Sequence, residues 1–387
     1  MGRSPRSLVL GRPHASVSRQ RTVATWHGEP VVTIADTPEA LTPAWLTEAL
    51  AGVLDGAAVA DVDRTPVGTG QMCDSVRLRL TYDGPVPEGS PASVIAKLPA
   101  ADEQSRATGL ALRSYETEVR FYQQLAPDLG IRTPRAYHAD IDVTTGSFVL
   151  LLEDLAPARQ GDQLAGCALA EATAALDQLV GLHAPRWGDP SLGQLEWLAR
   201  DPRWSRTFML GLLPNLWAGF TDRYADRLGP EVHEVGGGVI GDLEHYLEDP
   251  SARTVTHGDY RLDNLLFGGS PEAPTVAVVD WQTCGLGNAL SDVAYFIGAG
   301  LLVDDRRPNE EALVRRYHQR LGAAGVDLSW DECWRSYRRG SVAGVIMALA
   351  ASMLVERTAR GDDMFMVMAE RHARHALDVD ALEALSG

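Results

Sequence analysis

One segment of the sequence carries side chains of the kinds that phosphoryl transfer uses. Residues 257–264 read HGDYRLDN, and an apolar run after them leads to DWQ at residues 280–282. Phosphoryl transfer needs a group that orients the attacking hydroxyl, and oxygen atoms that hold a metal ion on the phosphates. Asp259 could orient the hydroxyl. Asn264 and Asp280 could hold Mg²⁺, which takes few protein oxygens, whereas HGD taken alone would be an ordinary turn.

A single lysine stands among the basic residues of the chain. The sequence holds 35 lysines and arginines, and Lys97 is the one lysine among them. A coding bias explains the arginines but not why one position keeps lysine. Because lysine is a compact point charge on a flexible stem and arginine is a broad planar fork, a site that needs the former would resist the bias. Chance survival is the alternative.

A strand and a helix are predicted around this lysine. Residues 93–98 read as a short strand that carries Lys97, and residues 110–125 have the apolar spacing of a helix. Glu118 shares the apolar face of that helix with two tyrosines. A carboxylate on a buried face is costly unless it is paired, so an ion pair with Lys97 is predicted. The alternative for Glu118 is a partly exposed helix acid.

The predicted elements run from strands to helices. Residues 76–82 alternate apolar and polar side chains, and residues 148–152 form an unbroken apolar run typical of a buried strand. From about residue 165 the chain is mainly helical, with two short strands near residues 264–267 and 275–281. This order predicts an α+β fold with segregated elements.

Composition excludes some classes of function. The net charge of −17 argues against a broad nucleic-acid-binding face, and no stretch approaches the ~18–20 apolar residues of a membrane span. The four cysteines lie far apart in sequence, which is typical of reduced thiols in a cytoplasmic protein. Residues 1–30 begin with a basic stretch that contains no acids. This segment is predicted to be a disordered tail, and a transit peptide is the alternative.

The HGD segment, the asparagine five residues after its aspartate and the aspartate at the end of the next strand resemble the catalytic and metal loops of the aminoglycoside phosphotransferase and choline kinase superfamily. The resemblance implies a bilobal protein-kinase-like fold that binds ATP and Mg²⁺ between its lobes. It makes Asp259 the catalytic base and Asn264 and Asp280 the metal ligands. His257 would be a structural residue of the loop.

Further features follow in the order of that superfamily. Gly68 and Gly70 resemble the loop that covers the phosphates of ATP, although a third glycine is missing and a turn is the alternative. Lys97 stands where the phosphate-binding lysine belongs, with Glu118 as its partner. The apolar run at residues 148–152 resembles the hinge strand, so Glu153 and Leu155 are predicted to bind the adenine. An ordinary core strand is the other interpretation.

The sequences DWQ and SDVAYF (residues 291–296) resemble the ecdysteroid-kinase-like, or CHK-like, branch of the superfamily. Three departures separate the chain from protein kinases: HGD replaces HRD, DWQ replaces DFG, and no Ala-Pro-Glu segment follows. These departures argue against peptide substrates. Asp292 could brace the catalytic loop or lie on a helix surface.

The resulting prediction is an ATP-dependent kinase that phosphorylates a hydroxyl of a small molecule. Residues 31–155 would form the nucleotide-binding lobe and residues 156–387 the catalytic and acceptor-binding lobe, with no obligate protein partner. An antibiotic-resistance kinase of the aminoglycoside type and a nucleotide-binding pseudokinase are the alternatives.

Two other patterns suggest ligand sites but have simpler explanations. His372 and His375 are three residues apart, and without a third ligand they are predicted to be solvated helix residues. The three glycines at residues 236–238 could bind an anion at a helix start. A flexible lead-in to a helix is the preferred interpretation.

Overall fold

The chain folds as strands followed by helices, so the predicted α+β class is confirmed. The computed structural model describes residues 33–68, 72–199, 202–248, 251, 253–355 and 357–386. Ile34–Gly387 form one unit by their contacts.

The described strands form three antiparallel sheets. The largest has the order β1-β2-β3-β5-β4, with β1 at Val59–Pro66, β2 at Cys73–Tyr82, β3 at Ser93–Pro99, β4 at Ala136–Asp142 and β5 at Ser147–Glu153. A three-stranded sheet contains β6 (Arg159–Gln160), β8 (Leu265–Ser270) and β9 (Ala273–Val278). The strands β7 (Arg253–Thr256) and β10 (Gly285–Asn288) form the third sheet.

Four helices lie within the strand-rich part: α1 Pro43–Ala49, α2 Ala51–Leu54, α3 Glu103–Ala111 and α4 Ser114–Gln124. The remaining helices follow β6: α5 Leu169–His183, α6 Pro202–Arg223, α7 Pro230–Gly241, α8 Leu243–Leu247, α9 Ala289–Gly300, α10 Val303–Ala323, α11 Trp330–Gly340, α12 Ala343–Leu354, α13 Ala359–Asp378 and α14 Ala381–Ser386. Within the described residues, no helix is both long and apolar enough to cross a membrane.

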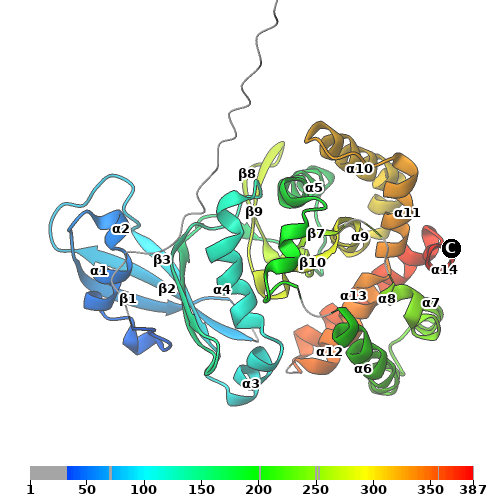
Figure 1. The fold of residues 1–387 in the computed structure, drawn as a ribbon, viewed down its shortest axis with the longest axis horizontal. Helices are drawn as coiled ribbons and strands as arrows, with labels where there is room; N and C mark the ends of the chain where they lie inside the picture. The colour runs from blue at the N-terminus through cyan, green and yellow to red at the C-terminus, as the bar shows by residue number, and fades with distance from the viewer. Residues whose placement is uncertain are drawn as a thin grey trace, which may run out of the picture. The chain divides into compact units, whose positions relative to one another are not determined.

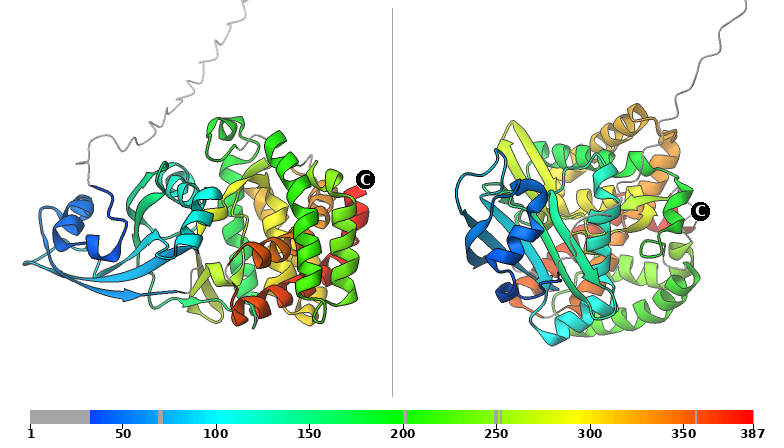
Figure 2. Two further views of the ribbon diagram at one scale, coloured as in Figure 1. Left: turned by 90° about the horizontal axis from the view of Figure 1, so that it is seen from below. Right: turned by 60° about the vertical axis from the view of Figure 1, so that its left-hand side comes forward.

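The five-stranded sheet and the later helices occupy separate regions of this unit. In Figure 1 the sheet, with α1 to α4, lies to one side of α5 to α14, and Figure 2 shows the same separation from two further directions. The hairpin β8–β9 and the pair β7–β10 lie with the helices. The HGDYRLDN segment at residues 257–264 therefore lies with the helices, while Lys97 lies on the sheet.

Both faces of the inner strand β5 are covered, which explains its unbroken apolar sequence. Phe148, Leu150 and Leu152 pack into the same core as α4. Val149 and Leu151 pack into a second core with α1 and α2. Side chains alternate between the two faces of a strand, so a strand buried on both sides needs apolar residues at every position.

The helix predicted over residues 110–125 is two helices in the structure. Arg113 has a left-handed backbone (φ 58°, ψ 25°), which ends α3 and starts α4 at Ser114. The first of the two helices begins after Asp102, whose carboxylate accepts a hydrogen bond from Ser105 N at 2.7 Å. The break at Arg113 lets α4 take its own direction and turn Glu118 toward the sheet.

One further prediction was wrong: the glycines at residues 236–238 lie inside α7 rather than before a helix. A Cβ on Gly236 would lie 2.4 Å from the ring of Trp217, so this position needs glycine. Close packing of α7 on α6, not flexibility, explains that glycine.

Candidate active site

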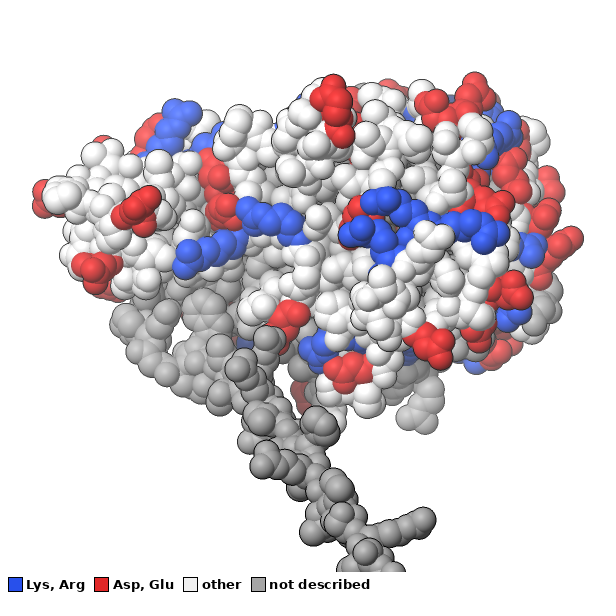
Figure 3. Space-filling view, turned by 90° about the horizontal axis from the view of Figure 1, so that it is seen from above, with Lys and Arg blue, Asp and Glu red and all other residues white. Residues whose placement is uncertain are grey.

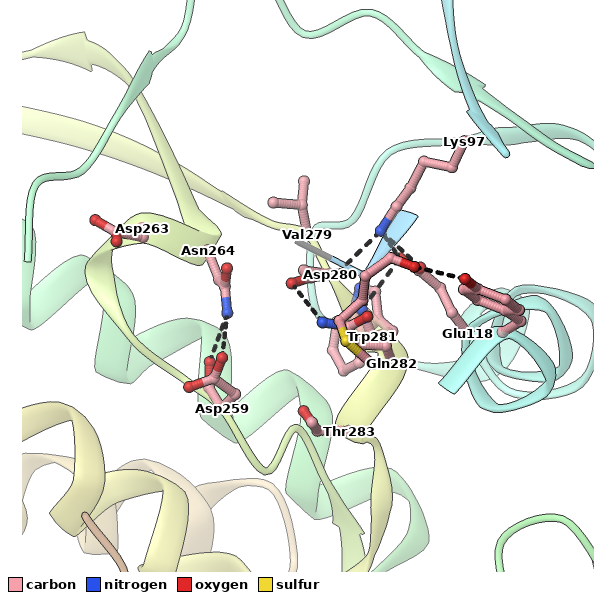
Figure 4. A network of polar contacts seen from close by, with 12 residues as sticks. Lys97, Glu118, Asp259, Asp263, Asn264, Val279, Asp280, Trp281, Gln282 and Thr283 are labelled. Carbon is pink, nitrogen blue, oxygen red and sulfur yellow. Dashed lines mark hydrogen bonds and ion pairs between the residues drawn. The ribbon is translucent and has the colours of Figure 1, made fainter. Parts of the chain in front are cut away.

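Lys97 and Glu118 form a buried ion pair between β3 and α4, so the predicted contact is confirmed. Lys97 Nζ lies 2.7 Å from Oε1 and 2.6 Å from Oε2 of Glu118, and the two side chains are 10% and 3% exposed. The same ammonium donates to Oδ1 of Asp280 at 3.0 Å (Figure 4). One lysine therefore links the sheet to the strand-end aspartate of the helical lobe.

Lys97 carries its charge despite its burial. Burial alone would lower the pKa of the ammonium, but the neighbouring carboxylates of Asp280 and Glu118 outweigh it and hold the pKa well above the usual value. Burial likewise opposes ionisation of Asp280, and the attraction of Lys97 overcomes it and lowers the pKa of that carboxyl. The site thus holds a permanent cation beside an anion, the arrangement that a triphosphate with its metal requires.

The backbone after β9 turns sharply at Asp280. This residue has φ 68° and ψ 66°, and the 3₁₀ turn η6 (Trp281–Thr283) follows it. Trp281 N donates to Glu118 Oε1 at 3.2 Å, and the indole stacks on Phe121 of α4 with ring centroids 3.8 Å apart. These contacts fasten the turn to α4 and fix the direction of the Asp280 side chain.

Three donors hold the carboxylate of Asp259. Its Oδ2 accepts from Asn264 Nδ2 and from Arg261 Nε, both at 3.0 Å. Its Oδ1 accepts from the hydroxyl of Tyr295 on α9 at 2.7 Å. Burial, and then the charge of Asp259, raise the pKa of Tyr295 well above its usual value, so the tyrosine remains a donor. The carboxylate has one fixed orientation.

The loop that carries Asp259 is anchored from α9. Asp292, which is 2% exposed, accepts hydrogen bonds from His257 N at 2.7 Å and Gly258 N at 3.0 Å. His257 Nε2 lies 3.0 Å from Val279 O and its Nδ1 accepts from Asp259 N at 3.2 Å, which requires the neutral tautomer protonated on Nε2. Asp292 therefore braces the loop and is not a surface acid.

The donor set around Asn264 and Asp280 fits a metal that arrives with a nucleotide. Asn264 donates hydrogen bonds to Asp259 through Nδ2, so the side-chain carbonyl oxygen of Asn264 can act as an acceptor. The side chain of Asp280 is 25% exposed. In the described part of the chain, no group of three or more His, Cys, Asp and Glu side chains could hold a metal alone. Mg²⁺ commonly takes one or two protein oxygens and completes its shell from phosphates and water.

Every predicted site residue that the structure describes lines one cavity of about 1240 Å³ between the sheet and the helices. Its lining includes Gly68, Lys97, Glu118, Glu153, Leu155, Asp259, Asn264 and Asp280. Gly70 lies outside the described residues, so its prediction stands as made. Figure 4 shows Asn264 directed at Asp259, and Asp280 in contact with the ammonium of Lys97.

Residues 91–338 match the model of the phosphotransferase enzyme family, APH, over more than half of the chain. The chain belongs to this family. The HGD loop, Asn264 and Asp280 all fall within the matched region, and so does Lys97. The resemblance to the superfamily is thereby confirmed, while the ecdysteroid-kinase-like branch stays a prediction.

Curated relatives of this APH-family chain match it over short segments. A segment of 58 residues is 54% identical to acyl-CoA dehydrogenase family member 10 of Mus musculus, and covers 15% of this chain and 5% of that protein. A segment of 121 residues is 30% identical to acyl-CoA dehydrogenase family member 11 of Gallus gallus, and covers 31% of this chain and 14% of that protein. The matched segments are small parts of much longer proteins.

A solved structure supports the fold of this APH-family chain. The ethanolamine kinase of Plasmodium vivax superposes with a TM-score of 0.51 at 8% identity, covering 88% of this chain and 90% of that one. At such low identity the likeness concerns the fold alone. The predicted two-lobed, kinase-like α+β fold is confirmed.

The sequence did not reveal all of the residues around Asp259. Tyr295 stands in the SDVAYF segment, but nothing local indicates that α9 turns its hydroxyl toward the catalytic loop. Arg261 lies between the two loop aspartates, and its guanidinium binds both Asp259 and Asp263. Its position in the HGDYRLDN motif, two residues from each aspartate, was the available signal.

Glu153 and Leu155, which were predicted to bind the adenine, both line the cavity, and the side chain of Glu153 is already hydrogen-bonded to protein. Both oxygens of Glu153 accept from Arg132 Nη2, at 2.8 and 2.9 Å, and Oε2 also accepts from Arg135 N. The neighbouring Asp154 accepts from Arg77 and Ser93. The side chains of Glu153 and Asp154 thus already have protein partners, and adenine binding at this strand end stays a prediction.

His372 and His375 are not solvated, so that prediction was wrong. Both side chains are fully buried. The ring of His372 stacks on Tyr295 with centroids 5.1 Å apart, and His375 Nε2 lies 2.7 Å from Glu310 Oε1. The helix α13 packs on α9, which buries the face that carries the two histidines.

Proposed function

We propose that the protein is an ATP-dependent phosphotransferase that phosphorylates a hydroxyl of a small molecule. The observation that carries this proposal is the convergence of Lys97, Asp259, Asn264 and Asp280 on one cavity. Residues 31–155 would bind the nucleotide, and residues 156–387 would supply catalysis and the acceptor site. Because the whole set is present, a pseudokinase is not favoured.

Lys97 would bind the α- and β-phosphates of ATP, with Glu118 holding the ammonium in place. The pair is preorganised, since both side chains are buried and hydrogen-bonded before any ligand arrives. Asn264 Oδ1 and the Asp280 carboxylate would hold Mg²⁺. This ion would neutralise the charge on the β- and γ-phosphates. Glu153 and Leu155 would offer backbone groups to the adenine, and Gly68 would lie over the phosphates.

Asp259 would accept a hydrogen bond from the acceptor hydroxyl and orient it for attack. Its Oδ2 already accepts from Asn264 and Arg261, so Oδ1 is the oxygen with the freer lone pair. An ionised carboxylate can accept about four hydrogen bonds in all. The three existing bonds leave room for one more, which would be that of the substrate.

Asp259→Asn tests the assignment of the base. The amide keeps the size of the side chain but cannot take a proton, so phosphoryl transfer should fall about 10²–10⁴-fold while the affinity for ATP is retained. Transfer is measured with γ-labelled ATP and a pool of hydroxyl-bearing metabolites, and binding by calorimetry. Parallel loss of ATP binding and transfer would contradict this role.

A further inference from the structure

The end of the cavity beyond Asp259 has an apolar wall from α12, α13 and the segment between them. The wall includes Met347, Leu354, Val355, Met364, Phe365 and Met368. Leu354 is 40% exposed at the cavity, and Leu112, which also lines it, is 39% exposed. Apolar side chains left open to solvent inside a cavity indicate a ligand that covers them.

The acids of the same cavity are already committed. Asp259 and Asp263 both accept from the guanidinium of Arg261. Asp154 is bound by Arg77, and the other acids that line the cavity among the described residues accept from Lys97, Gln282, Arg132 or backbone N–H groups. Asp74 and Asp102, on the sheet side of the cavity, accept only from backbone N–H groups, whereas Asp259 and Asp263, beside the α12–α13 wall, already have arginine partners. A polycationic acceptor on that wall would therefore find no carboxylate without a cationic partner among the described lining residues.

The net charge of the chain does not reverse this conclusion. On the face drawn in Figure 3, basic side chains stand among the acidic ones rather than leaving a uniformly acidic surface. Arg360 lines the cavity on the side of α13, its side chain 55% exposed and 3.7 Å from Asp263 Oδ2. The described rim at α13 therefore presents a guanidinium to an incoming acceptor.

We infer that the acceptor is a hydroxy compound with an apolar body rather than a polycationic one, seated on the α12–α13 wall with its hydroxyl at Asp259. This inference rests on the proposed function and narrows its substrate class. The apolar body would lie against Leu354, Met347 and Val355, the wall residues that are exposed or half-buried. Burying each added methylene group on such a wall improves binding about fourfold.

Two panels of acceptors test the inference with the full chain, ATP and Mg²⁺. The first contains aliphatic 1,2-diols of four, six, eight and ten carbons, and the second contains kanamycin, neomycin and spectinomycin. We expect phosphorylation of the diols, with kcat/KM rising about fourfold per methylene until the wall is covered. A preference for the aminoglycosides, a flat dependence on chain length or no transfer to either panel would overturn the inference.

A matched pair of variants links the chain-length effect to the wall. Leu354→Ser should lower kcat/KM for the ten-carbon diol about tenfold, because it removes the contact of a leucine side chain, and should affect the four-carbon diol much less. Leu302→Ser changes an equally exposed leucine (43%) outside the cavity lining and should alter neither. Equal effects of the two variants would refute the assignment. Asp259→Asn distinguishes the proposed phosphotransferase function from the inferred acceptor class. If this variant loses transfer to whichever acceptor is used, the proposed function is supported even where the dependence on chain length is not found.

Discussion

At the scale of single residues, the position of the Asp259 carboxylate depends on Tyr295. The tyrosine hydroxyl holds Oδ1 at 2.7 Å, and the ring is itself held by stacking on His372. Tyr295→Phe removes that one donor and keeps the ring. A hydrogen bond to a charged group contributes about 1.5–3 kcal/mol, so we expect kcat to fall roughly 10- to 100-fold with the KM for ATP unchanged.

The chain offers a matched control for this substitution. Tyr224 donates to the carboxylate of Asp362, also at 2.7 Å and also buried, but outside the cavity lining. Tyr224→Phe should lower stability by an amount similar to Tyr295→Phe and leave kcat near its original value. Steady-state kinetics and urea denaturation of both variants give the comparison. Equal kcat for the two would show that Tyr295 has a structural role alone.

At the scale of elements, the turn into the catalytic loop depends on Gly258. Its φ is 80°, and a Cβ there would lie 2.6 Å from the carbonyl oxygen of Thr283. Gly84 has a similar φ of 94° with nothing within 4 Å of an added Cβ. Both Gly→Ala changes incur the left-handed backbone cost of roughly 1–2 kcal/mol, but Gly258→Ala also displaces the loop. We expect activity to fall about 10²-fold in Gly258→Ala and to persist in Gly84→Ala.

The elements also show how far the sequence could lead. The motif residues and the Lys97–Glu118 pair were predictable from local properties of the chain. These are the periodicity of apolar residues, the cost of burying an unpaired carboxylate and the spacing of the motif residues. The α3–α4 break was not, because a left-handed arginine has no sequence signature. The position of Gly236 inside α7 depends on the ring of Trp217 in α6, and such a contact follows from tertiary packing.

At the scale of the whole molecule, a buried neutral histidine makes stability depend on pH. Burial, and then the neighbouring side chains of His375, Arg306 and Arg371, lower the pKa of His372 well below its usual value of 6.5. Both ring nitrogens lack a hydrogen-bond partner within the described residues. Below pH 6.5 the imidazole of His372 is therefore protonated in the unfolded chain but stays neutral in the folded chain. The free energy of unfolding consequently falls as the pH falls.

The substitution His372→Phe removes this proton and keeps a ring against Tyr295. Between pH 6 and pH 5 the free energy of unfolding of the original protein should fall faster than that of the variant, by about 1.4 kcal/mol per pH unit. Urea denaturation at each pH measures both slopes. Parallel slopes would show that His372 is protonated in the folded protein as well.

The two lobes of this molecule meet at Lys97, which contacts Glu118 on α4 and Asp280 after β9. The account claims that this ammonium lies beside the phosphates of ATP. Lys97 is the single lysine of the sequence, so an amine-directed reagent can report on this position alone among the side chains.

The most direct test uses an acyl-phosphate derivative of ATP, whose acyl group transfers to an amine beside the phosphates. Peptide mass spectrometry of the labelled protein should find the acyl group on Lys97, with labelling suppressed by excess ATP and Mg²⁺ and weakened in Asp280→Asn. An unlabelled Lys97, or labelling that ATP does not suppress, would contradict the account.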